Sequence, residues 1–520
     1  MLTKLKTFSL LGATSHSVDV EVSVTPAPKA ESADDSFDDT RTTIVGMAKT
    51  VVRESAFRVR LALEHSGFPP PRGSIVVNLA PADLPKQAAS FDLPISIGQI
   101  ASSGLARFDA LDQYAVIGEL DLDGRTRACR GALAAARAAK AQGLRGLLLP
   151  VENAREAALV DGIEAIPVAS LKEAVEFLRG ERKIAPAPGL SGDEFDAFRN
   201  YGIDFSEVRG QETAKRAMTI AAAGGHNLLM FGSPGAGKTM LAKRLATILP
   251  PMTLDEALET TEIYSALGKL DGKALVATRP FREPHHSISE PGLIGGGASP
   301  MPGEISLAHN GVLFLDELPE FNRKTLEALR QPLEDRVARI TRNNQTEVFP
   351  SNFILIAAMN PCPCGYRTDP RRKCRCTSAQ VEHYMARISG PLVDRIDIHV
   401  ETLPVSYREL SSTEPQTTSA ELREKVLRTR KIQEERYKDD DIRVNSAMRR
   451  KHLDAFARLD AGCAAMLEKA MEDFGLSARA HDKILRVART VADLDESEKI
   501  LEQHLFEALS YRILDRKLWK

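Results

Sequence analysis

A glycine-rich segment that ends in lysine and threonine carries the strongest chemical signal in the sequence. It fits G-x-x-x-x-G-K-[ST], a loop whose main-chain N–H groups surround phosphate oxygens. An apolar run at 227–231 precedes it, and residues 240–249 show helical spacing before Pro250. Strand, glycine loop and helix are the setting that a phosphate site needs, and a chance glycine turn is the alternative. The expected nucleotide contacts are Gly232, Ser233, Pro234, Gly235, Ala236, Gly237, Lys238, Thr239 and Met240.

Two side chains of this loop have specific expected roles. Lys238 would neutralise charge on the β- and γ-phosphates, and Thr239 would ligate Mg²⁺. The amino end of the following helix adds a positive partial charge at the same place.

Two further apolar runs end in polar residues. The first, 311–315, is followed by Asp316 and Glu317, and the second, 352–359, by Asn360. Ligands of open parallel sheets bind at the carboxyl ends of the strands. We therefore expect Asp316 to hold Mg²⁺, Glu317 to orient and deprotonate the attacking water, and Asn360 to contact the γ-phosphate or the water. The alternatives are ordinary strand-end acids and an asparagine turn.

Four of the six cysteines lie close together in sequence, as two Cys-x-Cys pairs. Four thiolates suit tetrahedral Zn²⁺, although the spacing differs from the usual C-x₂-C pair. Basic residues among them would lower thiol pKa values and could contact phosphates. Four reduced loop thiols are the alternative. The cysteines are Cys362, Cys364, Cys374 and Cys376, and the basic residues are Arg371, Arg372, Lys373 and Arg375.

Composition excludes several classes of protein. The chain has 520 residues, 43% hydrophobic and 27% charged, and a formal net charge of −2. A globally basic nucleic-acid coat is excluded, whereas a local basic patch is not. No apolar run approaches the roughly 18–20 residues of a membrane span, and we expect no signal peptide and a cytoplasmic location. Six cysteines are too few for a disulfide scaffold and favour a reducing compartment.

The elements that must position these residues fall into segments. Before residue 180 the pattern predicts strands at 17–24, 74–79 and 146–150 and helices at 51–65 and 130–142, with a loop at 26–39. Residues 182–192 look like a linker, 411–420 form a polar loop, and helices follow from 421 onward.

Two insertions accompany the apolar strands. Alternation on both sides of Asn343 and Asn344, within 336–350, predicts a β-hairpin that carries Arg339 and Arg342. A solvated basic hairpin is its plain interpretation. The glycine-rich stretch 277–297 predicts a mobile loop or hairpin. Its adjacent His285 and His286 would point apart on a strand, which argues against a metal site there.

The three strands in this order resemble those of AAA+ ATPases, and further segments resemble the magnesium-chelatase-like AAA+ family of the YifB/ComM type. The likeness covers nearly the whole chain and is densest from 200 to 400. It implies an α/β fold: a P-loop AAA+ core with a parallel sheet and a C-terminal helical lid. The segments are 282–287 (REPHHS), 292–297 (GLIGGG), 302–311 (PGEISLAHNG) and 360–365 (NPCPCG).

The resemblance also implies roles for residues that the motifs leave open. It implies a hexameric ring in which Arg395 is the arginine finger on a neighbour's ATP, with Arg387 as the second candidate. Arg479 would be the second sensor in the lid, and Gln211 would lie near the adenine base. The hairpin resembles the pre-sensor hairpin of related helicases, which points into the ring pore, so Arg339 and Arg342 become candidate DNA contacts.

The N-terminal segment resembles the family's Lon-protease-like domain, of the S5 domain 2-like α+β type. Ile95 falls on the nucleophile position of the loop at 91–98, and the segment 130–134 has no lysine to act as base. We therefore expect Ser96 to be structural and the domain to be an inactive scaffold. Residues 26–43 depart from the family pattern. The implied division is 1–181 Lon-protease-like, 182–200 linker, 201–410 ATPase core, 411–420 loop and 421–520 lid.

The favoured function is an ATP-driven DNA motor, a helicase or branch-migration enzyme of recombination and natural transformation. It would use ATP and Mg²⁺, assemble with itself and bind single-stranded or branched DNA, without membrane contact. A protein-remodelling or metal-chelatase-type motor is the alternative. A scaffold with vestigial hydrolysis is the third hypothesis, and the intact Lys238, Asp316 and Glu317 argue against it.

Overall fold

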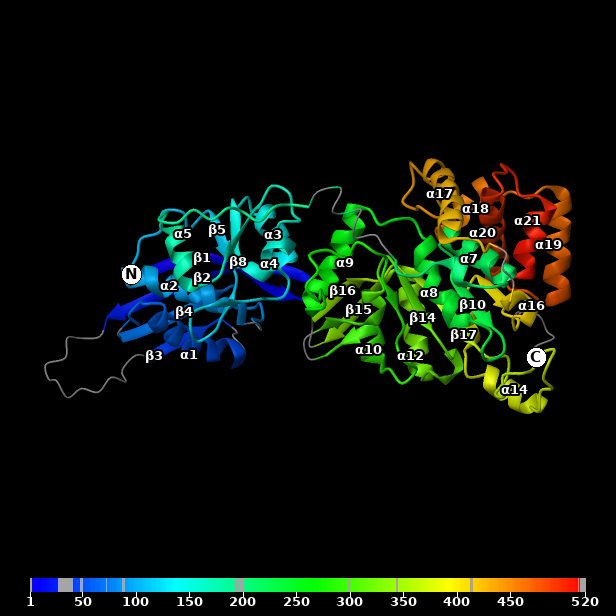
Figure 1. Ribbon diagram of the computed structural model, residues 1–520, viewed down its shortest axis with the longest axis horizontal. Helices are drawn as coiled ribbons and strands as arrows, with labels where there is room; N and C mark the ends of the chain where they lie inside the picture. The colour runs from blue at the N-terminus through cyan, green and yellow to red at the C-terminus, as the bar shows by residue number, and fades with distance from the viewer. Residues whose placement is uncertain are drawn as a thin grey trace. The chain divides into compact units, whose positions relative to one another are not determined.

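The computed structural model forms two compact units (Figure 1). Unit 1 comprises 1–198, 254–277 and 298–302, and unit 2 comprises 199–253, 278–297 and 303–520. Each unit has its own cluster of buried apolar side chains. The structure describes residues 2–26, 41–46, 50–71, 73–86, 89–190, 192, 195, 201–297, 300–342, 345–411, 415–512 and 514.

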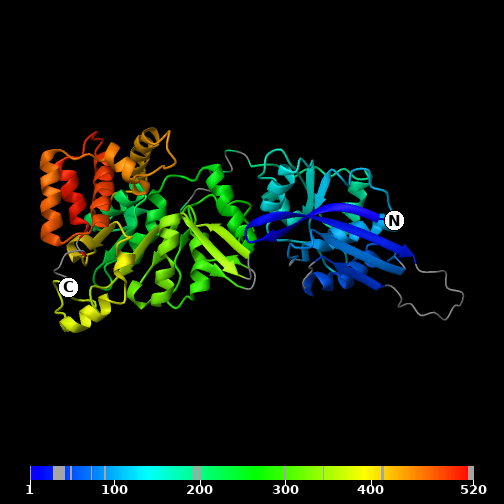
Figure 2. The same cartoon turned by 180° about the vertical axis from the view of Figure 1, so that it is seen from behind.

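Unit 1 is built on a seven-stranded mixed sheet of order β3-β4-β2-β1-β5-β8-β9. The long strands β1 (Leu2–Leu11) and β2 (Thr14–Pro26), blue in Figure 2, pair antiparallel. Alternate valines of β2 are buried, which confirms the strand predicted at 17–24. The predicted loop at 26–39 lies, from residue 27 onward, outside the described residues. The other strands of the sheet are β3 (Arg41–Val45), β4 (Gly73–Ala80), β5 (Tyr114–Val116), β8 (Gly146–Pro150) and β9 (Glu164–Val168). Two short strands, β6 (Glu119–Leu120) and β7 (Thr126–Arg127), pair with each other.

Helices α1 to α5 pack against this sheet, and a further helix of unit 1, which contacts α3, comes from the middle of the chain. The helices predicted at 51–65 and 130–142 are confirmed as α1 and α3. Helix α9 (Leu254–Leu267) joins unit 1 although it follows the glycine loop in sequence. Its Ser265 hydroxyl accepts from the Gly131 N–H at 3.0 Å, and its Glu262 pairs with Arg137 at 2.9 Å. The N-terminal helices are α1 (Thr50–His65), α2 (Asp92–Ser102), α3 (Ala132–Ala141), α4 (Val151–Ala157) and α5 (Leu171–Leu178).

The loop expected at 91–98 is wrong, because Asp92–Ser102 form helix α2. Nearly all of this helix is buried, including its polar residues Asp92, Ser96 and Gln99. Because the helix is short, is buried on every side and has Pro94 in its first turn, it has no exposed polar face from which a surface helix is predicted. The Ser96 hydroxyl is fully buried and donates to the Asp92 carbonyl at 2.8 Å.

Unit 2 holds a five-stranded sheet of order β11-β14-β17-β10-β18, in which every pairing is parallel. All residues of β10, β14 and β17 are buried, as expected for strands covered on both faces. The predicted parallel sheet is therefore confirmed. The strands are β10 (Leu228–Phe231), β11 (Phe281–Arg282), β14 (Val312–Leu315), β17 (Ile354–Met359) and β18 (Ile398–Glu401).

The stretch 277–297, expected to form a mobile loop or hairpin, contains several short regular elements. Phe281 and Arg282 form edge strand β11, and Glu290–Ile294 form helix α10. The Phe281 ring stacks on Phe314 with centroids 5.9 Å apart. Arg282 makes a two-bond ion pair with Glu304 at 2.6 and 2.9 Å. A strand of two residues shows no periodicity, so the sequence pattern could not reveal it.

The hairpin predicted around 343–344 is confirmed. Strands β15 (Val337–Arg342) and β16 (Gln345–Pro350) pair antiparallel, with Arg342 opposite Gln345. Short helices and strands complete this part of the chain. They are α7 (Glu212–Gly224), α8 (Lys238–Ile248), α11 (Glu304–Leu307), α12 (Arg323–Ala328), α13 (Arg330–Asp335), α14 (Ser378–Met385), α15 (Gly390–Val393), α16 (Tyr407–Leu410), β12 (Gly295–Gly296) and β13 (Met301–Pro302).

The C-terminal part of unit 2 is helical, as predicted, and begins at Ser419, two residues before the expected position. The Thr418 and Glu421 side chains form a capping box that fixes this start. Apolar residues of these helices share one buried cluster with helix α7 and the parallel sheet. None of the described helices is long and apolar enough to cross a membrane. The helices are α17 (Ser419–Arg436), α18 (Arg450–Phe456), α19 (Ala461–Phe474), α20 (Ala478–Leu494) and α21 (Glu502–Ser510).

Buried charges connect the sheet to these helices. Asp397, next to β18, accepts from Lys483 of α20 at 2.6 Å and from the Asn227 N–H at 3.1 Å. Burial alone would raise the pKa of Asp397, but Lys483 and His226 hold it well below its usual range. His399 is also fully buried, and burial, with Arg512 and Lys483, lowers its pKa well below the usual range.

We predict that unit 2 loses stability when the pH falls below about 6.5, the ordinary histidine pKa. Below that pH, His399 of the unfolded chain takes up a proton that the folded chain excludes, so unfolding is favoured by up to about 1.4 kcal/mol per pH unit. Urea unfolding at pH 7.5, 6.5 and 5.5 measures this loss. His399→Leu removes the group and should lose less stability between pH 6.5 and 5.5. Equal losses in the two proteins would contradict the role of His399.

Candidate functional site

The glycine loop lies between β10 and α8, as the sequence predicts. Gly235 and Gly237 have φ of 78° and 85°, which only glycine adopts without strain. At Gly232 a Cβ would lie 2.1 Å from the Thr402 carbonyl oxygen, so the loop approaches β18 too closely for a side chain. This curled backbone leads directly into helix α8, whose amino end faces the loop.

Lys238 lies under the loop, with 9% of its surface exposed. Its Nζ donates to the carbonyls of Gly232 at 2.8 Å and Ser233 at 3.1 Å, and to Asn360 Oδ1 at 3.3 Å. Burial lowers its pKa, while Asp316 and Glu317 oppose that effect. The ammonium group is therefore held beneath the loop, and a phosphate would replace some of these bonds.

Thr239 and Asp316 are in contact across the sheet edge. The Thr239 hydroxyl donates to Asp316 Oδ2 at 2.8 Å, and Asp316 Oδ1 accepts from the Glu317 N–H at 2.9 Å. A hydroxyl and a carboxylate are oxygen ligands of the type that Mg²⁺ prefers. The two residues fit a magnesium ion that also binds phosphate oxygens.

Glu317 adopts a left-handed backbone, with φ of 52°, and 58% of its side chain is exposed. Its Oε2 lies 3.6 Å from Nδ1 of His286. The rings of His285 and His286 lie with centroids 4.0 Å apart, so the two side chains do not point apart as expected. No sequence pattern indicates the contact between His286 and Glu317, because it depends on edge strand β11.

Asn360 follows β17 directly, between the ends of β14 and β10. Its amide oxygen contacts Lys238, so the ends of β10, β14 and β17 bring Lys238, Thr239, Asp316, Glu317 and Asn360 to one edge of the sheet.

Gln211 begins helix α7 and supports the loop from behind. Its φ is 60°, and its Nε2 donates to the Ala236 carbonyl at 3.0 Å and the Leu403 carbonyl at 2.6 Å. Its amide thus fixes the glycine loop to the segment after β18. Met240, in the first turn of α8, is 47% exposed.

The candidate arginines differ in their surroundings. Arg395 has 12% of its side chain exposed and pairs with Glu334 at 2.6 Å and with the Pro391 carbonyl at 2.8 Å. Arg387 is 45% exposed and pairs with Glu320 at 2.9 Å. Arg479 is exposed in the first turn of α20 and forms no hydrogen bond or ion pair with the described residues. Arg387 is therefore the more accessible of the two finger candidates.

One face of the β15–β16 hairpin is buried and the other is exposed. Ala338 and Ile340 face the protein, whereas Arg339 is exposed and pairs with Asp335 at 2.9 Å. Val348, opposite Arg339, is 52% exposed. The side chain of Arg342 lies outside the described part of the chain. The exposed face thus offers a cation beside an apolar side chain.

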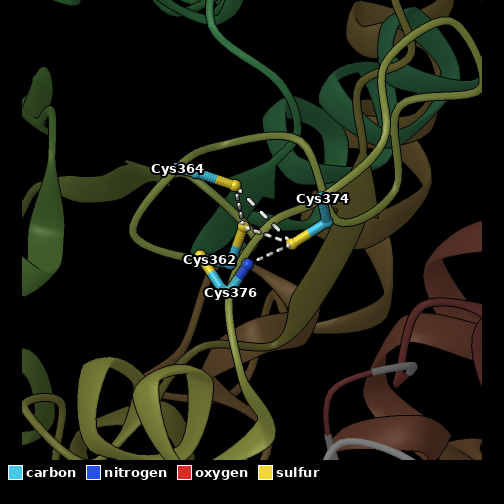
Figure 3. Close-up of side chains that lie close together, drawn as sticks. All are labelled: Cys362, Cys364, Cys374 and Cys376. Carbon is cyan, nitrogen blue, oxygen red and sulfur yellow. Dashed lines mark hydrogen bonds between the residues drawn. The ribbon is translucent and has the colours of Figure 1, made fainter.

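The four clustered cysteines converge after β17. The Cys362, Cys364 and Cys374 sulfurs lie 3.4 to 3.7 Å from one another, and Cys376 donates its N–H to the Cys374 sulfur at 3.4 Å (Figure 3). All four sulfur atoms lie within 4.8 Å of one another, and all are free thiols. The group could hold a metal ion.

Comparisons with known proteins identify the family. The model of "Magnesium chelatase, subunit ChlI" matches residues 204–410, "Subunit ChlI of Mg-chelatase" matches 35–153, and "Magnesium chelatase, subunit ChlI C-terminal" matches 416–512. The competence protein ComM of Haemophilus influenzae is 44% identical over 92% of this chain and 93% of its own length. The chain belongs to the magnesium-chelatase-like AAA+ family of the YifB/ComM type.

Two further relatives show how far the family extends. YifB of Escherichia coli is 41% identical over 92% of both chains. The magnesium-chelatase 38 kDa subunit of Rhodobacter capsulatus is 25% identical over 59% of this chain and 87% of its own length. Membership in this AAA+ family implies the use of ATP and Mg²⁺.

Proposed function

We propose that this chain is a ring-forming ATPase that moves DNA, as a helicase or branch-migration motor in recombination and natural transformation. The main support for ATPase activity is that Lys238, Thr239 and Asp316 converge behind a curled glycine loop. The proposal that DNA is the substrate is supported by the exposed face of the β15–β16 hairpin and by the 44% identity to a competence protein.

The residues of the site would have different roles in ATP hydrolysis. Glycine-loop N–H groups and Lys238 would hold the phosphates, with Gln211 fixing the loop beside the adenine base. Glu317 would take the proton of the attacking water, while His286 limits where its carboxylate lies. Thr239 and Asp316 would hold Mg²⁺, which would supply positive charge to the phosphate oxygens.

Completion of the site would require a neighbouring copy. Arg395, or the more exposed Arg387, would reach the γ-phosphate of an adjacent subunit in a hexameric ring. In the present conformation Arg395 must first leave Glu334. Arg479 would act as the second sensor from the C-terminal helices, which we propose to be the lid.

The N-terminal unit would be an inactive Lon-protease-like scaffold. The buried Ser96 hydroxyl is already bonded within its own helix and is not available as a nucleophile. The functional division would be 1–181 for this scaffold, 182–200 for the linker, 201–410 for the ATPase core, 411–420 for a loop and 421–520 for the lid.

We predict that DNA stimulates ATP hydrolysis and that binding weakens steeply with salt. Arg339→Ala should weaken binding to all DNA sequences alike and reduce the salt slope, because it removes a phosphate contact from each subunit. Fluorescence anisotropy with single-stranded and branched DNA at several salt concentrations measures this. Arg450→Ala, at a 71% exposed arginine of α18, is the matched control. No stimulation together with salt-insensitive binding would contradict the DNA function.

A protein-remodelling or chelatase-type motor is the second candidate, favoured by the likeness to the magnesium-chelatase 38 kDa subunit. Such a motor should hydrolyse ATP at a rate that DNA leaves unchanged. Unwinding of branched DNA by the intact protein would exclude it as the main activity.

A further inference from the structure

The loop that carries the four cysteines has the geometry of a metal site. A metal–sulfur distance of about 2.3 Å in a tetrahedron requires sulfurs about 3.8 Å apart. The distances of 3.4, 3.6 and 3.7 Å between three of the sulfurs are close to this value, whereas a disulfide needs about 2.05 Å. With every sulfur within 4.8 Å of the others, there is room for one ion and not for a cluster of several irons.

The charged residues of the cysteine loop are also compatible with a bound Zn²⁺. Four thiolates around Zn²⁺ leave a net charge of −2, and binding releases the thiol protons to solvent. Four basic residues of the loop offset that charge, and their exposed positions keep them in water. They are Arg371, Arg372, Lys373 and Arg375.

The same loop contacts the glycine loop of the nucleotide site. A Cβ on Gly365 would lie 2.6 Å from Cδ of Pro234, so the two backbones meet without space for a methyl group. Asp369 accepts from the Arg371 N–H at 2.8 Å, and this bond and the nearby Ser233 hydroxyl lower the pKa of Asp369. Cys362 also lies two residues after Asn360, which contacts Lys238.

We propose that Cys362, Cys364, Cys374 and Cys376 bind one structural Zn²⁺, and that the metal holds this loop against Ser233 and Pro234 so that nucleotide affinity depends on it. The four ligands close the chain between Asn360 and helix α14 into a fixed turn. Without the ion, four mutually close thiols have little to keep them together, and the support behind Pro234 is lost. The dependence of affinity rests on the proposed nucleotide site, whereas the zinc site does not.

Metal content tests the first half of the proposal. Full-length protein purified without chelators should contain about one zinc and little iron per chain by elemental mass spectrometry. Lys238→Ala should keep that zinc while losing nucleotide binding. The double variant Cys374→Ser/Cys376→Ser should lose it, and Cys129→Ala, at a thiol outside the cluster, should keep it. Less than about half an equivalent in the wild type would overturn the site.

Nucleotide affinity tests the second half. The double cysteine variant should bind a fluorescent ATP analogue about 10- to 100-fold more weakly than the Cys129→Ala control, with unchanged far-ultraviolet circular dichroism. Gly365→Ala tests the contact without touching a ligand: it should keep its zinc and bind the analogue more weakly. Wild-type affinity in folded, zinc-free protein would overturn the coupling. A wild type that holds zinc but binds no nucleotide would instead refute the proposed function and leave the zinc site standing.

Discussion

Glu317→Gln should still bind ATP and should lose about 100- to 10,000-fold in turnover. The amide keeps the size of the side chain but cannot take a proton from water. The carboxylate lies beyond Asp316 at the end of β14, 3.6 Å from Nδ1 of His286. Lys238, Thr239 and Asp316 are untouched by the change, so the phosphate contacts remain. Steady-state hydrolysis and binding of a fluorescent ATP analogue measure the two effects separately.

The matched control for this variant is Glu290→Gln, which neutralises an exposed carboxylate at the start of α10. It should hydrolyse ATP at the wild-type rate. Turnover by Glu317→Gln within a few-fold of wild type would refute the general-base role. The next hypothesis would then be that Asn360, rather than Glu317, positions the attacking water.

Mixing the inactive Arg395→Ala and Lys238→Ala variants should restore hydrolysis, because the first supplies an intact phosphate site and the second supplies the arginine. Arg395→Ala alone should lose about 10³- to 10⁵-fold in rate, the usual effect of removing an arginine finger. Lys238→Ala should be inactive because its own loop cannot hold phosphate. In mixed rings, an Arg395→Ala subunit has an intact phosphate site. A Lys238→Ala neighbour supplies the wild-type Arg395 to that site. Hydrolysis measured across mixing ratios should rise to a maximum and fall again.

The same mixing experiment with Arg387→Ala decides between the two arginines. Arg387 is the more exposed, at 45% against 12%, whereas the family resemblance favours Arg395. Arg428→Ala, at a 58% exposed arginine of α17, should be fully active and serves as the control. If neither Arg395→Ala nor Arg387→Ala regains activity with Lys238→Ala, no arginine of this pair acts on a neighbour's nucleotide.

The central part of the site could be predicted because its strands are buried on both faces. Such strands appear in the sequence as unbroken apolar runs, and these runs predict β10, β14 and β17. Parallel strands end at a common edge, so the residues after each run are expected to meet. The contacts of Lys238 with Asn360 and of Thr239 with Asp316 agree with that expectation.

Other features carried no local signal. The two-residue strand β11 has no period, and so the proximity of His286 to Glu317 could not be foreseen. Helix α2 is buried on every side and has no exposed polar face, so the sequence pattern does not mark it as a helix. Helix α9 joins unit 1 through contacts such as Ser265 with Gly131, which are 134 residues apart in sequence. Long-range packing of this kind leaves no trace in a single sequence.

One feature of the cysteine loop could be predicted from the sequence, and another could not. Its Cys-x-Cys pairs are visible in the sequence and predict a cluster, which the structure describes with sulfurs 3.4 to 3.7 Å apart. The contact of Gly365 with Pro234 depends on the path of the loop between the pairs and could not be predicted.

The rate of ATP hydrolysis per chain as a function of protein concentration tests most directly whether two copies share each site. The glycine loop and Glu317 belong to one copy, and the arginine would come from the next. We predict that the rate per chain falls steeply on dilution, in parallel with dissociation of the assembly followed by mass photometry. A monodisperse single copy that hydrolyses ATP at an undiminished rate would contradict this account.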